Sequence, residues 1–267
     1  MVDLNKKCPT GIPGLDELLG GGFPRARSIL LSGSCGTGKT TFAVQFLYNG
    51  IVQYDEPGIL ISLEQDPREL KQDMLSFGFD LAKLEKEGKL AIVDTSLSRV
   101  GLASLGGSPS FDDSIGSPEG SMSLLPDEFN IKKILEIVVD KAEKIGAKRV
   151  VFDSIPALDF LIKDHGDMKY AVRQVLLALN YRLKAVGLTT VLITETAEDN
   201  ALSAHGVESY VADGTILLSI NEALDNRTMK IRKMRQTVHS LKPRTIEFTS
   251  EGVVVKGVEK GSGRKLF

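Results

Sequence analysis

Short apolar runs alternate with longer amphipathic stretches over the first two thirds of the chain. The runs are aliphatic and short, which is typical of buried strands, and the stretches between them have helical periodicity. Strands that alternate with helices predict βαβ units and a mostly parallel sheet. The predicted strands are Arg27–Gly33, Gly58–Glu64, Lys89–Asp94, Lys148–Ser154 and Leu188–Glu195. The predicted helices are Gly38–Ile51, Asp66–Phe77, with Asp66 as N-cap and Pro67 as first helical residue, Pro126–Ile145 and Asp167–Val186.

The pattern changes after Asp213, where strands follow one another without helices. These strands are Gly214–Ile220, Arg227–Arg235, Arg244–Ser250 and Gly252–Gly257, and we expect them to extend the sheet in antiparallel fashion. We therefore predict an α/β fold over residues 1–267 with no second domain. Residues 98–126 are rich in Gly, Ser and Pro and form either a mobile surface insertion or a functional loop. Residues 257–267 are expected to be a frayed tail.

Composition narrows the protein class only slightly. The net charge of −2 and pI near 6.0 give no global case for nucleic-acid binding, although a local one stays open. No run approaches the roughly 18 apolar residues of a membrane helix, and the N-terminus has no apolar signal region. The two cysteines, Cys8 and Cys35, lack metal-ligand spacing and favour a reducing, cytoplasmic setting.

The clearest motif directly follows the first predicted strand and opens a helix. It matches G-x-x-x-x-G-K-[ST], a loop whose backbone N–H groups surround phosphate oxygens. Lys39 would carry charge to the terminal phosphates and Thr40 would offer its hydroxyl to Mg²⁺. An ordinary glycine-rich turn is the alternative. The candidate nucleotide-binding residues are Gly33, Ser34, Cys35, Gly36, Thr37, Gly38, Lys39, Thr40 and Thr41.

Acidic residues lie at or next to the carboxyl ends of several predicted strands. Carboxyl ends of parallel strands face the ligand crevice, so Asp153 is the candidate for the Mg²⁺ contact, although it could also only cap a turn. Glu64 is the candidate that orients an attacking water, the alternative being a solvated strand-end charge. Thr194 and Glu195 give a weaker signal for sensing the γ-phosphate.

Positive charge gathers late in the chain, with seven Lys or Arg and no Asp or Glu between Arg227 and Arg244. On a strand, residues alternate faces, and the odd-numbered face here is apolar at first and polar afterwards. The polar part holds Lys233, Arg235, Thr237 and His239. The core-facing side of the strand thus becomes basic toward its end. This favours the interpretation that these side chains reach a phosphate over the interpretation that the strand is uniformly solvated.

The order of these motifs resembles that of a KaiC-type ATPase, in the RecA superfamily, and most closely the single-domain archaeal type. The stretches that carry the resemblance are TGIPGLDELLGGGFPRARSILLSGSCGTGKTT, LISLEQDPRELKQDMLSFGFDL, RVVFDS, TTVLITE, GVESYVADGTILL and RTMKIRKMRQTVHS. The resemblance implies homo-oligomeric rings, typically hexamers, with ATP between subunits. It also implies Gly36–Thr41 at the phosphates, Glu64 as catalytic carboxylate and Ser76 near the base. Finally, it implies that the next subunit's nucleotide is contacted by Lys233, Met234, Arg235, Thr237 and His239.

The chain departs from the family pattern at the catalytic strand. The usual pair of glutamates is Glu64-Gln65 here, which predicts slow hydrolysis if the second carboxylate activates water. Ala26 replaces a glycine, and no phosphorylatable Ser-Thr pair accompanies Ser203, so no autokinase activity is inferred. We expect a ring-forming, regulatory Mg²⁺-dependent ATPase with an unidentified protein partner. The alternatives are a RadA-like DNA-dependent ATPase, disfavoured because residues 196–210 lack Lys and Arg, and a non-hydrolysing ATP-stabilised scaffold.

Overall fold

The computed structural model describes residues 6–94, 122–123, 131–161, 167–196 and 203–257. Most of the 98–126 segment, the start of the predicted 126–145 helix and all but the first residue of the 257–267 tail lie outside the described residues. Within these ranges the elements are, in chain order, β1 (Lys7–Cys8), α1 (Leu15–Leu19), β2 (Phe23–Pro24), β3 (Ser28–Gly33), α2 (Lys39–Tyr54), β4 (Gly58–Ser62), α3 (Pro67–Leu75), α4 (Leu81–Lys86), β5 (Leu90–Asp94), β6 (Met122–Ser123), α6 (Ile131–Ile145), β7 (Arg149–Asp153), the 3₁₀ helix η2 (Ile155–Leu161), α7 (Met168–Ala185), β8 (Thr189–Glu195), α8 (Glu208–Val211), β9 (Gly214–Asn221), η3 (Glu222–Leu224), β10 (Asn226–Met234), β11 (Arg244–Thr249) and β12 (Gly252–Val255).

A ten-stranded sheet organises the described residues, in the order β12-β11-β10-β9-β3-β8-β7-β4-β5-β6. The strands from β9 through β3 to β6 pair in parallel. The strands from β9 to β12 pair antiparallel. The predicted strands are all present, and both the parallel sheet and its antiparallel extension are confirmed. β1 and β2 form a separate antiparallel pair that the apolar pattern did not predict.

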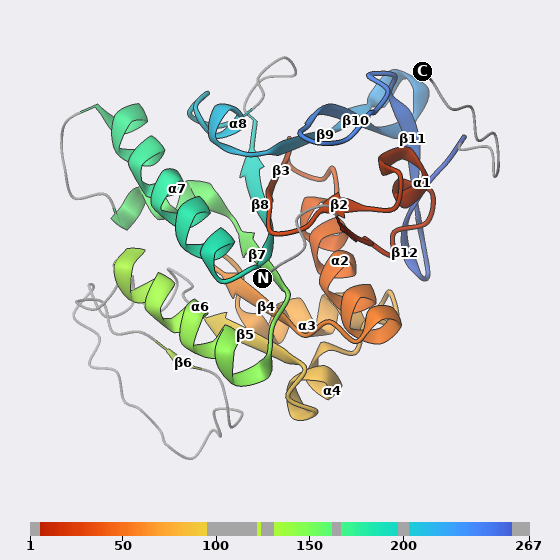
Figure 1. Cartoon of the computed structure of the whole chain (residues 1–267). Helices are drawn as coiled ribbons and strands as arrows, with labels where there is room; N and C mark the ends of the chain where they lie inside the picture. The colour runs from red at the N-terminus through yellow and green to blue at the C-terminus, as the bar shows by residue number, and fades with distance from the viewer. Residues whose placement is uncertain (1–5, 95–121, 124–130, 162–166, 197–202, 258–267) are drawn as a thin grey trace, which may run out of the picture.

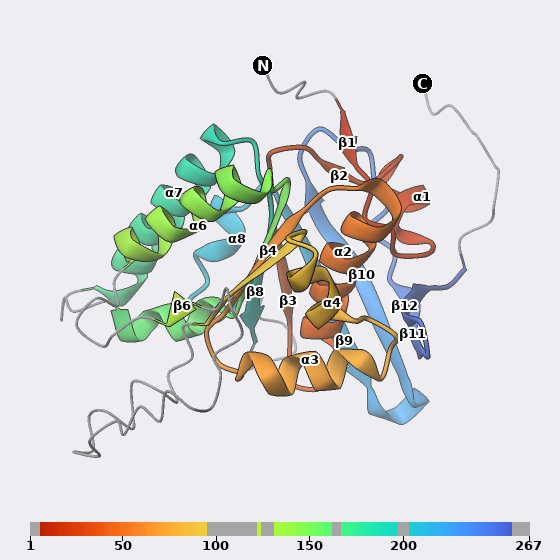
Figure 2. The ribbon, with the colours of Figure 1, turned by 90° about the horizontal axis from the view of Figure 1, so that it is seen from below.

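Helices cover both faces of the sheet, as Figures 1 and 2 show. One core lies beneath α1, α2, α3 and α4 and includes the apolar side chains of β10–β12. The other lies beneath α6 and α7. Both faces are therefore buried, which explains why β3, β4 and β5 are apolar without alternation. Among the described residues, no helix is long and apolar enough to cross a membrane.

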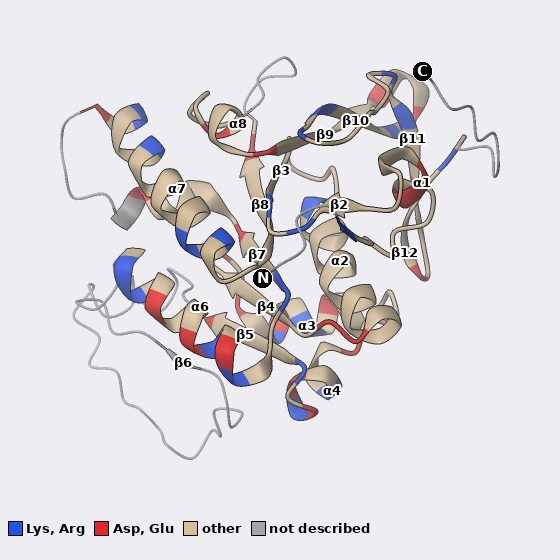
Figure 3. Cartoon of the chain, in the orientation of Figure 1, with Lys and Arg blue, Asp and Glu red and all other residues tan. Residues whose placement is uncertain are grey.

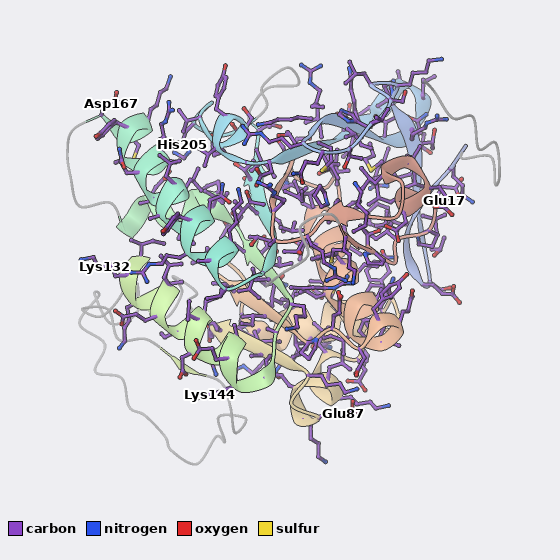
Figure 4. The ribbon with its side chains drawn as sticks, in the orientation of Figure 1. Glu17, Glu87, Lys132, Lys144, Asp167 and His205 are labelled. Atoms are coloured by element: carbon purple, nitrogen blue, oxygen red, sulfur yellow. The ribbon has the colours of Figure 1, made fainter. Side chains whose placement is uncertain are left out.

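Two of the long helices begin where the sequence places a capping aspartate. Asp66 accepts a hydrogen bond from the Arg68 N–H, and Pro67 is the first residue of α3. Asp167 accepts one from the Lys169 N–H, and Figure 4 shows it at the start of α7. The end of α3 differs slightly from the prediction. The helix ends at Leu75 rather than near residue 77, because the chain reverses there through a glycine at φ 75°.

The basic strand β10 is present close to its predicted bounds but differs from the expected alternation of residues 229–239 in where it ends and in its phase. It ends at Met234, and Gln236 has a positive φ of 57°, so residues 237–239 follow a turn instead of continuing the strand. Ile231 pairs with Ile216 and Lys233 pairs with Thr215, which leaves Arg232 as the extra residue of a β-bulge. Strict alternation across residues 229–239 was therefore a wrong expectation.

The bulge decides which side chains of β10 enter the core. Met229, Ile231 and Met234 are each at most 3% exposed, whereas strict alternation would have buried Lys233. The extra residue thus keeps an apolar side chain facing the core to the end of the strand. It also places Arg232 and Lys233 consecutively outside that apolar row. Figure 3 shows Lys and Arg on β10 and on the neighbouring β11.

Candidate nucleotide-binding site

The topology brings the sequence-predicted acids to one edge of the sheet. β3 lies at the centre, and its carboxyl end leads through residues 34–38 into α2. β8 pairs directly with β3, so Gly33 lies opposite Glu195. β7 and β4 follow, and their register places Asp153 opposite Ser62, two residues before Glu64. Three carboxylates from three strands therefore converge on the glycine-rich loop.

The loop has the backbone that the motif requires. Gly36 and Gly38 have φ values of 76° and 89°, in the region that glycine adopts without steric cost. A Cβ on Gly38 would lie 2.0 Å from a ring carbon of Phe248, so a second constraint also demands glycine there. The Lys39 ammonium donates to the Ser34 carbonyl at 2.8 Å and lies 3.7 Å from a Glu195 oxygen. This lysine therefore lies within the loop that it would help to charge.

Thr40 and Asp153 form the pair expected of a Mg²⁺ site. The Thr40 hydroxyl donates to Asp153 Oδ2 at 2.8 Å. Burial raises the pKa of Asp153 to about 6, and the nearby Glu64 and Glu195 charges add to the increase, whereas the Thr40 hydrogen bond and the Lys39 charge oppose it. The described residues contain no cluster of three or more His, Cys, Asp or Glu that could hold a metal. One hydroxyl and one carboxylate fit Mg²⁺, which takes few protein ligands and completes its shell with phosphate and water.

Glu64 lies beside this pair. The Ser154 hydroxyl donates to its Oε1, and the Leu63 N–H donates to the Asp153 carbonyl at 2.7 Å, which ties the ends of β4 and β7 together. The peptide bond between Asp153 and Ser154 is cis. Glu64 itself is exposed, so water can reach it. Gln65 instead donates from its amide to Asp73 on α3 at 2.8 Å.

A pocket of about 390 Å³ opens between these groups. Besides the loop residues, Glu64, Asp153 and Glu195, it is lined by Arg227 and Phe248, which no sequence motif marks as site residues. Arg227 donates from Nε to the Gly36 carbonyl at 3.3 Å, and its guanidinium lies 5.0 Å from the centre of the Phe248 ring. Arg227 opened the basic stretch in the sequence, but nothing in the pattern distinguished Phe248 from other strand residues.

Comparisons with known proteins identify the family of this chain. A family model described as "ATPase: KaiC" matches residues 8–260. The chain belongs to the KaiC family of ATPases. Over 94% of its length, the chain is 37% identical to the circadian clock oscillator protein KaiC of Prochlorococcus marinus. The match covers 45% of that relative. The chain thus spans less than half of that curated relative.

Two further proteins similar to this chain match it over nearly their whole length. A UPF0273 protein of Methanocaldococcus jannaschii is 34% identical, with 94% of this chain and 96% of that protein covered. The crystal structure of a KaiC-like protein from Pyrococcus horikoshii superposes with a TM-score of 0.76 at 38% identity, covering 94% of this chain and 99% of that one. The RecA-like, KaiC-type fold predicted from the motifs is therefore confirmed.

The residue expected near the base of the nucleotide does not line the pocket. Ser76 caps the C-terminal end of α3, is exposed, and donates its hydroxyl to the Asp73 carbonyl at 2.6 Å. Its neighbour Phe77 lies 6.4 Å from Phe248, ring centre to ring centre. Ser76 is therefore adjacent in sequence to Phe77, whose ring lies near the pocket residue Phe248. Its KaiC-type role near the base stays a prediction.

None of the five residues expected to contact a neighbour's nucleotide lines the pocket of this chain, and all five lie within the described residues. The Lys233 ammonium donates to two carbonyls at the end of α8, and Arg235 contacts Asp213. Thr237 accepts a hydrogen bond from Lys7, and His239 Nδ1 lies 3.0 Å from the Thr237 carbonyl. Met234 has its side chain in the core, so only its backbone could reach a ligand.

Proposed function

We propose that this KaiC-family ATPase domain hydrolyses ATP with Mg²⁺ in a ring of identical subunits, with each nucleotide bound between two copies, and serves a regulatory role. The observation that carries the proposal is the single pocket in which the phosphate loop, the Thr40–Asp153 pair and Glu64 meet. The ring is supported by the position of Lys233 at the end of β10 and of Arg235 directly after it, because both lie outside the pocket of their own chain. A cation that cannot serve its own site is suited to a neighbour's.

The residues of the pocket divide the chemistry between them. The loop N–H groups, the N-terminus of α2 and Lys39 would bind the phosphates. Thr40 and Asp153 would hold Mg²⁺, which when bound neutralises charge on the phosphate oxygens. Glu64 uses Oε1 to accept the Ser154 hydrogen bond, which leaves Oε2 to accept one from a water molecule. The Ser154 contact thereby fixes the carboxylate that would orient the attacking water.

Charge developing on the transferred phosphoryl group needs donors from outside this pocket. Lys233 and Arg235 of the adjacent copy would supply them, and removing such an arginine finger lowers turnover by about 10³ to 10⁵ where it has been measured. The hydrogen-bond partners of Lys233 are neutral carbonyls, and Asp213 neutralises the charge of Arg235 only in part. Lys233 and Arg235 together therefore keep a net positive charge for the phosphate. This arrangement makes hydrolysis depend on assembly.

The test compares nucleotide binding, assembly and phosphate release in matched variants. Glu64→Gln should bind ATP and assemble normally but lose at least about 100-fold in turnover, whereas Glu69→Gln on exposed α3 should match the wild type. Arg235→Ala should assemble and fail to hydrolyse, and mixing it with Lys39→Ala subunits should restore a fraction of the activity. Retained turnover in Glu64→Gln would remove Glu64 from its role.

Two other outcomes would replace the proposal. Rings that retain intact ATP through purification, with no phosphate release, would favour an ATP-stabilised scaffold. A rate that rises with single-stranded DNA would favour a recombinase-like ATPase.

A further inference from the structure

A fully buried carboxylate lies at the junction between α8 and β9. Asp213 is 0% exposed, and three cations from three separate parts of the chain surround it. Its Oδ1 lies 3.3 Å from Arg235 Nη1 and 3.5 Å from Arg27 Nη1. Its Oδ2 lies 2.6 Å from Lys184 Nζ and 3.2 Å from the Ser28 backbone nitrogen. Oδ2 therefore binds the body of the protein through Lys184 and the Ser28 N–H, whereas Oδ1 is shared between Arg27 and Arg235.

The charges in this cluster do not balance. One carboxylate faces three cations, so the cluster carries a net positive charge of two when all four groups are ionised. Burial alone would raise the pKa of Asp213, but the Lys184 hydrogen bond and charge and the Ser28 N–H outweigh it and lower the pKa. The anchor is therefore charged at neutral pH. Arg235 is 55% exposed and contacts Asp213 through Nη1, so its guanidinium is accessible to a further anion.

The backbone fixes Arg235 at the same point. Its N–H donates to the Asp213 carbonyl at 3.0 Å, directly after β10 ends. The preceding Met234 pairs with Gly214, and a Cβ on that glycine would lie 2.6 Å from the Met234 sulfur. The end of β10 is thus packed tightly against the start of β9. Arg235 leaves this junction with both its main chain and one side-chain nitrogen held by Asp213.

The second cation is held by the same short segment. The Lys233 ammonium donates to the Ala212 carbonyl at 2.6 Å and to the Ser209 carbonyl at 3.2 Å, at the C-terminal end of α8. Burial lowers the pKa of Lys233, and the charge of Arg235 adds to that decrease. Two like charges are therefore held close together, and the Ala212–Asp213 step contacts both of them. The Asp213 charge offsets part of this repulsion, and a further anion shared between the two cations would offset more of it.

We propose that Asp213 is the positioning residue for Arg235 in the site shared with the neighbouring subunit. The inference rests on the proposed function, because it assigns Arg235 a phosphate on another copy. Held at Nη1, the guanidinium presents its remaining donors in a fixed orientation and loses little rotational freedom when the phosphate binds. Positioning of this kind contributes to rate because a displacement of about 1 Å can cost on the order of 10²-fold.

The test is a double-mutant cycle on ATP turnover with Asp213→Asn, Arg235→Ala and the double variant. Asparagine keeps the size of the side chain and an acceptor for the Ser28 N–H but removes the charge. We expect Asp213→Asn to lower kcat by about 10- to 100-fold with KM for ATP unchanged. Arg235→Ala should lose about 10³-fold or more, and the double variant should be no slower than Arg235→Ala alone. A buried ion pair with a purely structural role would instead give losses that multiply.

A second variant covers the case in which Asp213→Asn does not fold. Lys184 is 28% exposed, so Lys184→Met should be tolerated, and it removes the closest partner of Oδ2. We expect a loss of about 2- to 5-fold in kcat because the anchor is less fixed, and no further loss in the Arg235→Ala background. The control is Arg182→Met, which removes an exposed cation from the same helix and should leave turnover unchanged.

Each failure has its own signature. Loss in Arg235→Ala, combined with multiplying losses or no effect from the anchor variants, would overturn the positioning role and leave the proposed function intact. An Arg235→Ala protein as active as the wild type would refute the shared site itself, and the role of Asp213 would fall with it.

Discussion

Asp153 gives the sharpest prediction because its expected effects on stability and activity have opposite signs. The substitution is Asp153→Asn, which keeps the acceptor for the Thr40 hydroxyl and removes the charge. Burial raises the pKa of Asp153 in the folded protein to about 6 from an ordinary value of 3.8. An acid whose pKa is raised on folding stabilises the folded state below its unfolded pKa and loses that contribution as the pH rises through its folded pKa.

The magnitude follows from this difference of about two pKa units. Each unit corresponds to about 1.4 kcal/mol, so ionised Asp153 costs the folded protein up to about 3 kcal/mol above pH 6. Asparagine does not ionise and avoids this cost. We therefore expect Asp153→Asn to be more stable than the wild type by about 1–3 kcal/mol near pH 7.5. The difference should shrink as the pH falls from 6 toward 3.8 and vanish below that value, where Asp153 becomes protonated in both states.

The assay is urea-induced unfolding at several pH values between about 4.5 and 7.5, at one protein concentration and with EDTA in place of nucleotide and Mg²⁺. Asp140→Asn serves as the control, because Asp140 is an exposed acid on α6 paired with Lys144. It should change the free energy of unfolding by less than about 0.5 kcal/mol at every pH. Mg²⁺-dependent turnover of Asp153→Asn should meanwhile fall at least about 100-fold. A variant less stable than the wild type near pH 7.5, or a difference independent of pH, would refute the reasoning.

Two further predictions concern the glycine-rich loop. Gly38→Ala should lower the free energy of unfolding by at least about 2 kcal/mol and weaken nucleotide binding, because the new methyl group would collide with Phe248 at a positive φ. Gly20→Ala, at a similar φ with no atom within 4 Å, should cost only about 1 kcal/mol, and equal losses in urea titrations would contradict the steric argument. Cys35 is exposed on the loop whereas Cys8 is buried with its pKa raised to about 11, so a thiol reagent should modify Cys35 alone until the protein unfolds. ATP should slow that reaction, and rapid modification of Cys8 in the native protein would show that its site opens.

The parallel sheet could be predicted because its strands are buried on both faces. A strand with two buried faces is apolar at most positions and lacks the alternation of a half-exposed strand, and this signal needs no knowledge of its neighbours. The caps at Asp66 and Asp167 could also be predicted, since the cap is a local bond between a side chain and a nearby N–H. Short elements such as α4 and α8 could not, because a helix of one or two turns is stabilised mostly by tertiary packing.

The candidate site divides in the same way. The phosphate loop and the strand-end acids were predictable because a motif and a topological rule specify them. Phe248 belongs to β11, which pairs with β10 and β12, and it reaches the loop through long-range contacts that no local pattern contains. Asp213 could not be predicted as a site residue for a similar reason, since its three cations come from residues that are far apart in the sequence.

The bulge at Arg232 has a consequence for how this chain can be altered. Because one extra residue resets the phase of β10, substitutions and changes of length act on different properties of the strand. Replacing Arg232 would change surface charge and leave Met234 in the core. An insertion between Met229 and Ile231 would displace every later residue of the strand by one position. A lysine side chain would then face the core and the Met234 side chain would face solvent, although none of the original residues had been replaced. Engineering of this edge of the sheet should therefore use substitutions and avoid insertions or deletions.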